Sequence, residues 1–323
     1  MFKTQSLKGL LLGGAIALLS SVPAVAQDKF VRIGGGLAGT YPLFAAKFAE
    51  LMNANVPGVR ASVVPSDTEP AQIQIENGEM EFNIGYTFVT GKIYNGQGGL
   101  GIPTPKARHV ITLYGSVLQP LVNPGKMKSL SEINNGRYRV WTGPEGFIFD
   151  QMISPALEAH GVTRDSIAKN GGVVETMGYA QELQAYQDGN IDVAFFAGGL
   201  PLGMLSQVEN SPGFDLVPFE EEAMKKVIEA LPGVSEAVIP AGTYKNQTED
   251  LRAMYFVNHL VTSADVDEEI VYQATKLMME KYADFHGLFP GSAEIDDKDP
   301  LANNFLPVHP GAERYYREAG LLK

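Results

Sequence analysis

Two glycine-containing loops carry residues whose types could bind a ligand. The first, Gly34-Gly35-Gly36-Leu37-Ala38-Gly39-Thr40-Tyr41-Pro42, follows an apolar run and precedes a helical pattern. The second, Thr142-Gly143-Pro144-Glu145-Gly146-Phe147, has the same setting further along the chain. The first N–H groups of a helix lack intrahelical partners and lie at the positive end of its dipole. We therefore expect each loop to offer backbone amides to an oxygen atom of a small ligand.

The first loop also matches G-x-G-x-x-G, a pattern typical of dinucleotide sites. In such sites an acidic residue about 20 positions further on binds the ribose. The nearest acidic candidate here, Asp67, lies farther away, and no Gly-Lys-Ser or Gly-Lys-Thr follows the glycines. The sequence therefore predicts no nucleotide and no other cofactor.

Signals of catalysis are weak. The chain has no cysteine, which excludes thiol nucleophiles, thiolate zinc sites and iron–sulfur clusters. Its five histidines show no H-x-x-x-H spacing, and there is no G-x-S-x-G elbow. Ser166-Ile167-Ala168-Lys169 fits S-x-x-K but lacks companion motifs. We predict no catalytic residue and no metal site.

Strand-like apolar runs alternate with helical patterns along most of the chain. This alternation is typical of parallel sheets with helices on both faces, and hence of an α/β protein. The expected strands are 30–33, 61–64, 82–86, 138–141, 173–176 and 193–197. The expected helices are 42–53, 70–77, 147–160, 181–188, 265–281 and 311–319.

One helix–strand junction occurs twice. At Asn77-Gly78 and at Asp188-Gly189 a glycine ends a helix, an acidic residue follows three places later, and an apolar strand begins. Glycine ends helices because it tolerates the left-handed conformation. Two such junctions, each followed by a polar or glycine-rich loop, indicate two similar lobes.

The first 26 residues match a secretory signal peptide. Lys3 and Lys8 lead into an apolar run, and Ala24 and Ala26 form an A-x-A cleavage pattern. The run is shorter than the ~20 apolar residues that span a bilayer. We expect cleavage near Ala26 and a periplasmic protein of 297 of the 323 residues. Losing two lysines shifts the net charge from −12 to −14, and this acidity argues against nucleic acid as a partner.

The chain resembles the TAXI family of solute receptors, which serve TRAP-type transporters. The similar segments are 34–42, 56–61, 94–96, 196–201, Pro240-Ala241-Gly242-Thr243-Tyr244 and the closing segment 306–320. The resemblance implies a type II periplasmic-binding-protein fold, with two α/β lobes around a hinged ligand cleft. It also implies delivery of a small organic solute, in this family an organic acid, to membrane permease subunits driven by an ion gradient rather than by ATP.

Three loops depart from the pattern of that family. Pro65-Ser66-Asp67-Thr68-Glu69-Pro70 replaces a Ser-Thr-Gly-Gly-Ser-like loop, Tyr86-Thr87-Phe88 replaces Gln-Ser-Asp, and 144–148 replaces Pro-Gly-Ser-Gly-Thr. Aromatic and acidic side chains thus stand in place of hydroxyl and amide groups. Added acids repel a dicarboxylate unless a cation intervenes, so we expect a less anionic, or a more aromatic or apolar, ligand.

The predicted lobes are 27–118 with 240–323, and 119–239. We expect ligand contacts in the loops that follow strands. In the first lobe these are Gly39, Thr40, Tyr41, Ser66, Thr68, Tyr86 and Thr87, and in the second Thr142, Gly146, Phe147, Gly198, Gly199 and Leu200. The alternatives are a receptor for an ATP-driven importer or a sensory system, and an exported hydrolase, which a substrate screen would reveal by turnover.

Overall fold

The computed structural model describes residues 28–295 and 297–322, so the predicted signal peptide lies outside the described residues. The strands are β1 (Lys29–Gly34), β2 (Val59–Val64), β3 (Phe82–Tyr86), β4 (Ala107–Val122), β5 (Arg139–Trp141), β6 (Val173–Glu175), β7 (Val193–Gly198), β8 (Asp215–Leu216), β9 (Ser235–Ile239) and β10 (Leu251–Ser263). They form one sheet in the order β2-β1-β3-β10-β4-β7-β5-β6, with β8 beside β4 and β9 beside β10.

Helices connect these strands and cover the sheet. The α-helices are α1 (Tyr41–Asn55), α2 (Thr68–Glu76), α3 (Thr87–Tyr94), α4 (Asp150–Ala159), α5 (Arg164–Lys169), α6 (Tyr179–Gln187), α7 (Glu221–Ala230), α8 (Glu268–Glu280) and α9 (Pro310–Glu318). Short 3₁₀ helices are η1 (Leu130–Asn135), η2 (Gly203–Gln207), η3 (Tyr282–Phe285) and η4 (Ser292–Glu294). Within the described ranges, no helix has the length and apolar character needed to cross a membrane.

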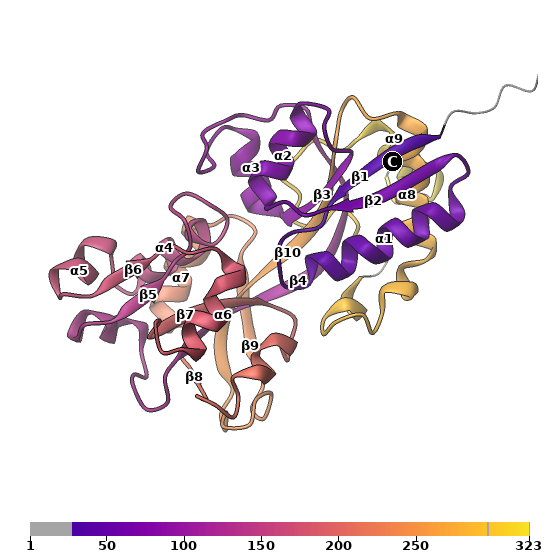
Figure 1. Ribbon diagram of the computed structural model, residues 1–323. Helices are drawn as coiled ribbons and strands as arrows, with labels where there is room; N and C mark the ends of the chain where they lie inside the picture. The colour runs from indigo at the N-terminus through magenta and orange to yellow at the C-terminus, as the bar shows by residue number, and fades with distance from the viewer. Residues whose placement is uncertain (1–27, 296, 323) are drawn as a thin grey trace, which may run out of the picture.

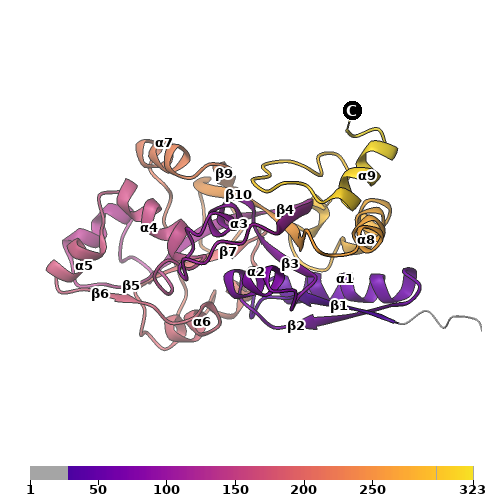
Figure 2. The same cartoon turned by 90° about the horizontal axis from the view of Figure 1, so that it is seen from above.

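The molecule consists of two bodies joined by β4 and β10 (Figures 1 and 2). We call the body around β1, β2 and β3, with α1, α2, α3, α8 and α9, the first lobe. The body around β5, β6 and β7, with α4 to α7, is the second lobe. β4 and β10 pair with each other, and at their outer edges β10 pairs with β3 and β4 with β7, so they belong to both lobes. The predicted lobe boundaries fall inside β4 and between β9 and β10, and stay a prediction.

Most of the expected elements are confirmed to within a few residues, and the helix-ending glycines Gly78 and Gly189 have φ of 73° and 70°. The prediction of a loop after the third strand is wrong, because α3 begins at Thr87, directly after β3. Phe88 and Ile93 of this helix are buried, and the Phe88 ring lies 6.1 Å from that of Phe256 on β10. Apolar contact with the joining strands therefore stabilises a helix where the sequence predicts a loop after the third strand.

Each lobe has its own apolar core. Phe44, Phe48 and Phe285 are fully buried in the first lobe, and the rings of Phe44 and Phe285 stack 5.0 Å apart. In the second lobe Trp141 and Phe196 are fully buried. The second core continues across the joining strands and takes in Phe88 and Ile93 of α3, so the two lobes also share apolar contact where β4 and β10 join them.

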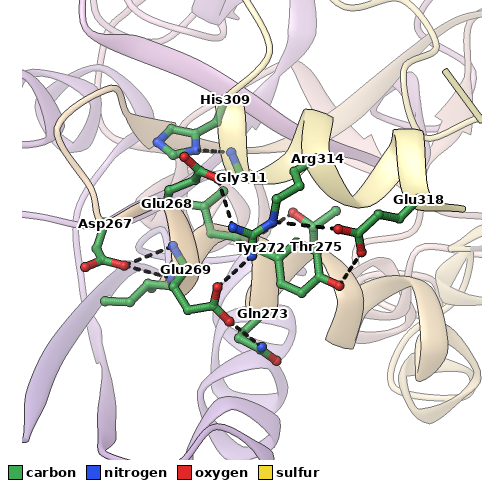
Figure 3. Close-up of polar contacts among 12 residues, drawn as sticks. Asp267, Glu268, Glu269, Tyr272, Gln273, Thr275, His309, Gly311, Arg314 and Glu318 are labelled. Atoms are coloured by element: carbon green, nitrogen blue, oxygen red, sulfur yellow. Dashed lines mark hydrogen bonds and ion pairs between the residues drawn. The ribbon is translucent and has the colours of Figure 1, made fainter. Parts of the chain in front are cut away.

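The closing segment that carries the family resemblance folds as α9 and packs against α8 (Figure 3). The guanidinium of Arg314 lies 3.9 Å from the centre of the Tyr272 ring and pairs with Glu268 at 2.9 Å and Glu269 at 2.6 Å. Gly311 allows the close approach, because a Cβ at this position would lie 2.3 Å from the Glu268 carbonyl oxygen. The motif is therefore accounted for by packing within the first lobe.

Gly311→Ala should lower the free energy of unfolding by about 1–3 kcal/mol, because the new methyl group overpacks the contact between α8 and α9. Urea unfolding followed by circular dichroism measures this. Gly203→Ala is the matched control, since a Cβ at Gly203 meets no atom within 4 Å. If both variants unfold at the wild-type urea concentration, the contact does not require a glycine.

Candidate ligand-binding site

A hollow of about 100 Å³ lies between the two lobes. The first lobe lines it with the loop between β1 and α1, the start of α2 and the end of β3: Gly36, Leu37, Ala38, Gly39, Thr40, Tyr41, Asp67, Thr68 and Tyr86. The second lobe lines it with Ile148, Phe149, Gly178, Tyr179, Ala180, Gln181 and Ala197. Strands β1, β2 and β3, like β5, β6 and β7, run parallel within their lobes, and all the lining segments lie at or after their carboxyl ends. Open α/β sheets bind ligands at this edge.

A second hollow of about 50 Å³ lies beside the first. The two share Asp67, Thr68, Ile148, Phe149, Gly178 and Tyr179. The smaller one is completed by Glu69 on α2 and by Trp141, Pro144 and Phe147 of the second lobe. The shared lining makes the two hollows parts of one site, which extends from the glycine loop of the first lobe to the loop between β5 and α4.

Aromatic rings form much of the lining. In the second lobe Phe149 and Tyr179 stack with ring centres 4.3 Å apart. In the first lobe the rings of Tyr41 and Tyr86 meet edge to face at 6.0 Å, and Phe256 supports Tyr86 at 4.5 Å. Rings held in this way give a ligand a large apolar surface at little cost in side-chain entropy.

The glycine loop brings the first lobe close to these rings. Gly36 and Gly39 have φ of 67° and 76°, in the left-handed region that favours glycine. A Cβ on Gly39 would lie only 3.5 Å from the Tyr179 ring of the other lobe. The Thr40 hydroxyl is held 2.8 Å from the Tyr114 hydroxyl on β4. These glycines therefore provide a turn and a close approach between the lobes. This role explains the glycine pattern without a bound nucleotide phosphate.

The charged side chains that line the two hollows are Asp67 and Glu69. Glu69 is buried, and its carboxylate accepts hydrogen bonds from the backbone N–H groups of Gly99 and Leu100, both at 2.9 Å. The Asp67 carboxylate forms no hydrogen bond or ion pair within the described chain, and partial burial raises its pKa. No lysine, arginine or histidine is among the described residues of the lining.

The tyrosines of the lining stay neutral at physiological pH. Burial raises the pKa values of Tyr41 and Tyr179 well above the ordinary value for tyrosine. Burial also raises the pKa of Tyr86. The Tyr41 hydroxyl has no hydrogen-bond partner of normal geometry within the described chain, although Tyr86 lies close enough to affect its pKa. The site therefore combines negative charge with neutral hydroxyl groups.

A family model described as the NMT1-like family matches residues 33–320. The chain belongs to the NMT1-like family. Two solved structures share the fold. A protein described as a periplasmic transporter is 14% identical, with a TM-score of 0.53 over 93% of this chain and 94% of that chain. PhnD1 from Prochlorococcus marinus (MIT 9301), in complex with methylphosphonate, is 12% identical, with a TM-score of 0.50 over 91% of this chain and 99% of that chain. The type II periplasmic-binding-protein fold is thereby confirmed.

In this NMT1-like protein the predicted contact residues fall into two groups. Those that line the hollows are Gly39, Thr40, Tyr41, Thr68, Tyr86 and Phe147. Those that line neither hollow are Ser66, Thr87, Thr142, Gly146, Gly198, Gly199 and Leu200. The structure thus brings the two predicted loops, 39–41 and 144–147, to one site, and their role in binding stays a prediction.

Several residues of the second group hold the loops in place. The Thr142 hydroxyl accepts a hydrogen bond from Arg164 at 2.9 Å and is buried. Gly146 donates its N–H to the Asp150 carboxylate at 2.7 Å. A Cβ on Gly199 would lie 1.9 Å from the Pro290 carbonyl oxygen, so this residue contacts the first lobe directly. Thr87 is fully buried at the start of α3, and its hydroxyl has no partner within the described chain.

The lining residues at the N-terminal end of α6 are not among the predicted contacts. Gly178, Tyr179, Ala180 and Gln181 follow a predicted strand and open a predicted helix, which is the same setting as that of the two predicted ligand loops. That setting could have identified them. Within residues 28–295 and 297–322, no group of three or more histidine or acidic side chains is placed to hold a metal ion.

Proposed function

We propose that this NMT1-like protein is a periplasmic solute-binding receptor that delivers a small organic ligand to the permease subunits of a TRAP-type transporter. One observation carries the proposal: both lobes line a single hollow at the carboxyl ends of their parallel strands. A ligand that contacts both lobes favours the closed arrangement by its difference in affinity for the two states. A permease could then recognise the closed, loaded form.

The TRAP-type assignment is supported by the sequence segments shared with TAXI receptors. Some of these are now explained by packing, as with Gly311 and Arg314 on α9. Others, such as the loop over 34–42, contribute to the hollow. PhnD1 binds methylphosphonate, an anion, whereas the hollow of this chain is lined by carboxylates. We infer that this chain takes a small solute of different charge.

Thermal-shift screening of the wild-type protein against a metabolite library, followed by calorimetry, should find a ligand. Ala180→Phe should then abolish its binding, because the new ring fills the hollow that Ala180 lines at the start of α6. Ala168→Phe is the matched control, since Ala168 is also exposed and helical but lies on α5, away from the hollow. Equal binding by both variants would contradict the proposed site.

The transporter partner needs a test of its own. Liposomes that contain the TRAP-type permease subunits from the same organism should accumulate the ligand only when this protein and an ion gradient are present. Uptake that requires ATP and an ATPase instead would favour the alternative of an ATP-driven importer. Turnover of a compound without uptake would favour the hydrolase.

A further inference from the structure

We propose that the hollow between the lobes selects a small organic cation, such as an alkyl- or arylammonium ion, with Asp67 as its counter-ion and the rings of Tyr41, Tyr86, Phe149 and Tyr179 as its walls. This inference rests on the proposed function, because it names the ligand class of the same site. Three properties of the lining carry it: its charge, its aromatic content and its size.

Charge is the first property. A carboxylate that is partly removed from water without a partner favours a cation beside it. Asp67 is an exposed residue whose carboxylate is about half removed from water; it lines both hollows and forms no hydrogen bond or ion pair within the described chain. Glu69 adds a second negative charge at the smaller hollow, although its oxygens already bind Gly99 and Leu100. An anionic ligand would meet these carboxylates with no lysine, arginine or histidine among the described lining residues to offset them.

Aromatic content is the second property. Four rings line the larger hollow, two from each lobe, so that a ligand in it has aromatic neighbours on both sides. The face of an aromatic ring attracts a cation, and the attraction grows as the cation loses water. The stacked pair of Phe149 and Tyr179, 4.3 Å apart, is held as a rigid surface for such a contact.

Size is the third property. The two hollows measure about 100 and 50 Å³. A cavity of about 150 Å³ in another protein holds one benzene molecule. The ligand is therefore limited to roughly the size of choline or benzylammonium, and a cation of that size loses most of its water when both lobes surround it.

Calorimetry with two sets of probes of equal shape tests this proposal. The first set is choline, 3,3-dimethylbutan-1-ol and 3,3-dimethylbutanoate, and the second is benzylammonium, benzyl alcohol and benzoate. We expect at least one cation to bind tenfold or more tightly than its neutral and anionic counterparts. Asp67→Asn should weaken binding of the cation by tenfold or more and so remove that preference. Glu145→Gln is the matched control, because it removes a nearby exposed carboxylate that lines neither hollow.

Three results would overturn the inference: no cation of either set binds, a neutral or anionic probe binds as tightly as its cationic counterpart, or Asp67→Asn leaves the preference intact. The proposed function would survive any of these if a metabolite from the library still bound and Ala180→Phe still abolished that binding. It would fail separately if Ala180→Phe left the binding of every ligand unchanged.

Discussion

Gly99→Val should weaken ligand binding by about tenfold to a hundredfold while leaving the melting temperature of the ligand-free protein close to that of wild type. Gly99 of the first lobe lies against Gly146 of the second, and a Cβ on Gly99 would be 2.9 Å from the Gly146 carbonyl carbon and 2.9 Å from the Phe147 ring. Overpacking of this kind costs about 1–3 kcal/mol, and each 1.4 kcal/mol changes affinity about tenfold. Calorimetry with the ligand found by screening measures the loss.

The specific effect on binding is expected because both contacting loops are fixed within their own lobes. The buried Glu69 carboxylate holds the N–H groups of Gly99 and Leu100. The Asp150 carboxylate holds the N–H of Gly146 and pairs with Arg164 at 2.5 Å. Neither loop can therefore move aside easily when a side chain is added. The added valine acts only when the lobes come together, which is the step that a ligand in the hollow favours.

Small-angle X-ray scattering distinguishes hindered closure of the lobes from direct damage to the ligand-binding site. The ligand should reduce the radius of gyration of the wild-type protein, and the reduction should be smaller for Gly99→Val at the same fractional saturation. Gly203→Val is the control, because a Cβ there meets no atom within 4 Å. If Gly99→Val binds and compacts like wild type, closure does not use the contact between Gly99 and Gly146.

The architecture could be predicted well from local sequence signals. The apolar run 30–33 and Pro42 place β1 and α1, and Pro42 indeed lies in the first turn of that helix. The glycines at 78 and 189 end α2 and α6, as their tolerance of positive φ predicts. These signals act within a few residues along the chain, so they are present in the sequence itself.

The contacts across the site could be predicted less well, because they depend on how segments meet in space. The positions of Tyr41 and Tyr86 after strands predict them as contacts, but the approach of Tyr179 to Gly39 joins residues 140 positions apart. The sequence predicts Gly199 as a ligand contact, yet its Cα faces the Pro290 backbone of the other lobe. A glycine that allows two lobes to touch and a glycine that binds a ligand have the same local sequence pattern.

Acid should destabilise the protein between pH 6.5 and pH 4 through two buried histidines on the joining strands. His109 on β4 and His259 on β10 are fully buried, with their Nδ1 atoms 2.9 Å apart. The outer nitrogens lie 2.9 Å from the Pro300 carbonyl and 2.6 Å from the Thr90 hydroxyl. Neutral rings satisfy all three contacts if Thr90 donates to His259, His259 donates to His109, and His109 donates to Pro300. In that arrangement the single Thr90 hydroxyl proton is not shared with the nearby Tyr86 and Thr87 carbonyls.

The sign of the pH effect follows from the pKa values. Burial lowers the pKa of His109 to about 4 and that of His259 well below its usual value, whereas a histidine in the unfolded chain titrates near 6.5. Below pH 6.5 the unfolded chain therefore binds more protons, and stability falls as the pH falls towards the folded pKa. For His109 alone the expected loss between pH 7 and pH 5 is about 2 kcal/mol. Urea unfolding across this range measures it.

His109→Gln should be less stable than wild type at pH 7 but should lose about 2 kcal/mol less on going to pH 5. His160 and His309, whose pKa values are also lowered by burial, keep part of the acid sensitivity in both proteins. His286→Gln is the control, because its ring lies outside the pair and bonds the Ile295 carbonyl. Parallel losses in His109→Gln and wild type would show that the pair does not titrate in this range. The steeper loss of wild type would instead place the main acid-sensitive group on the strands that join the lobes.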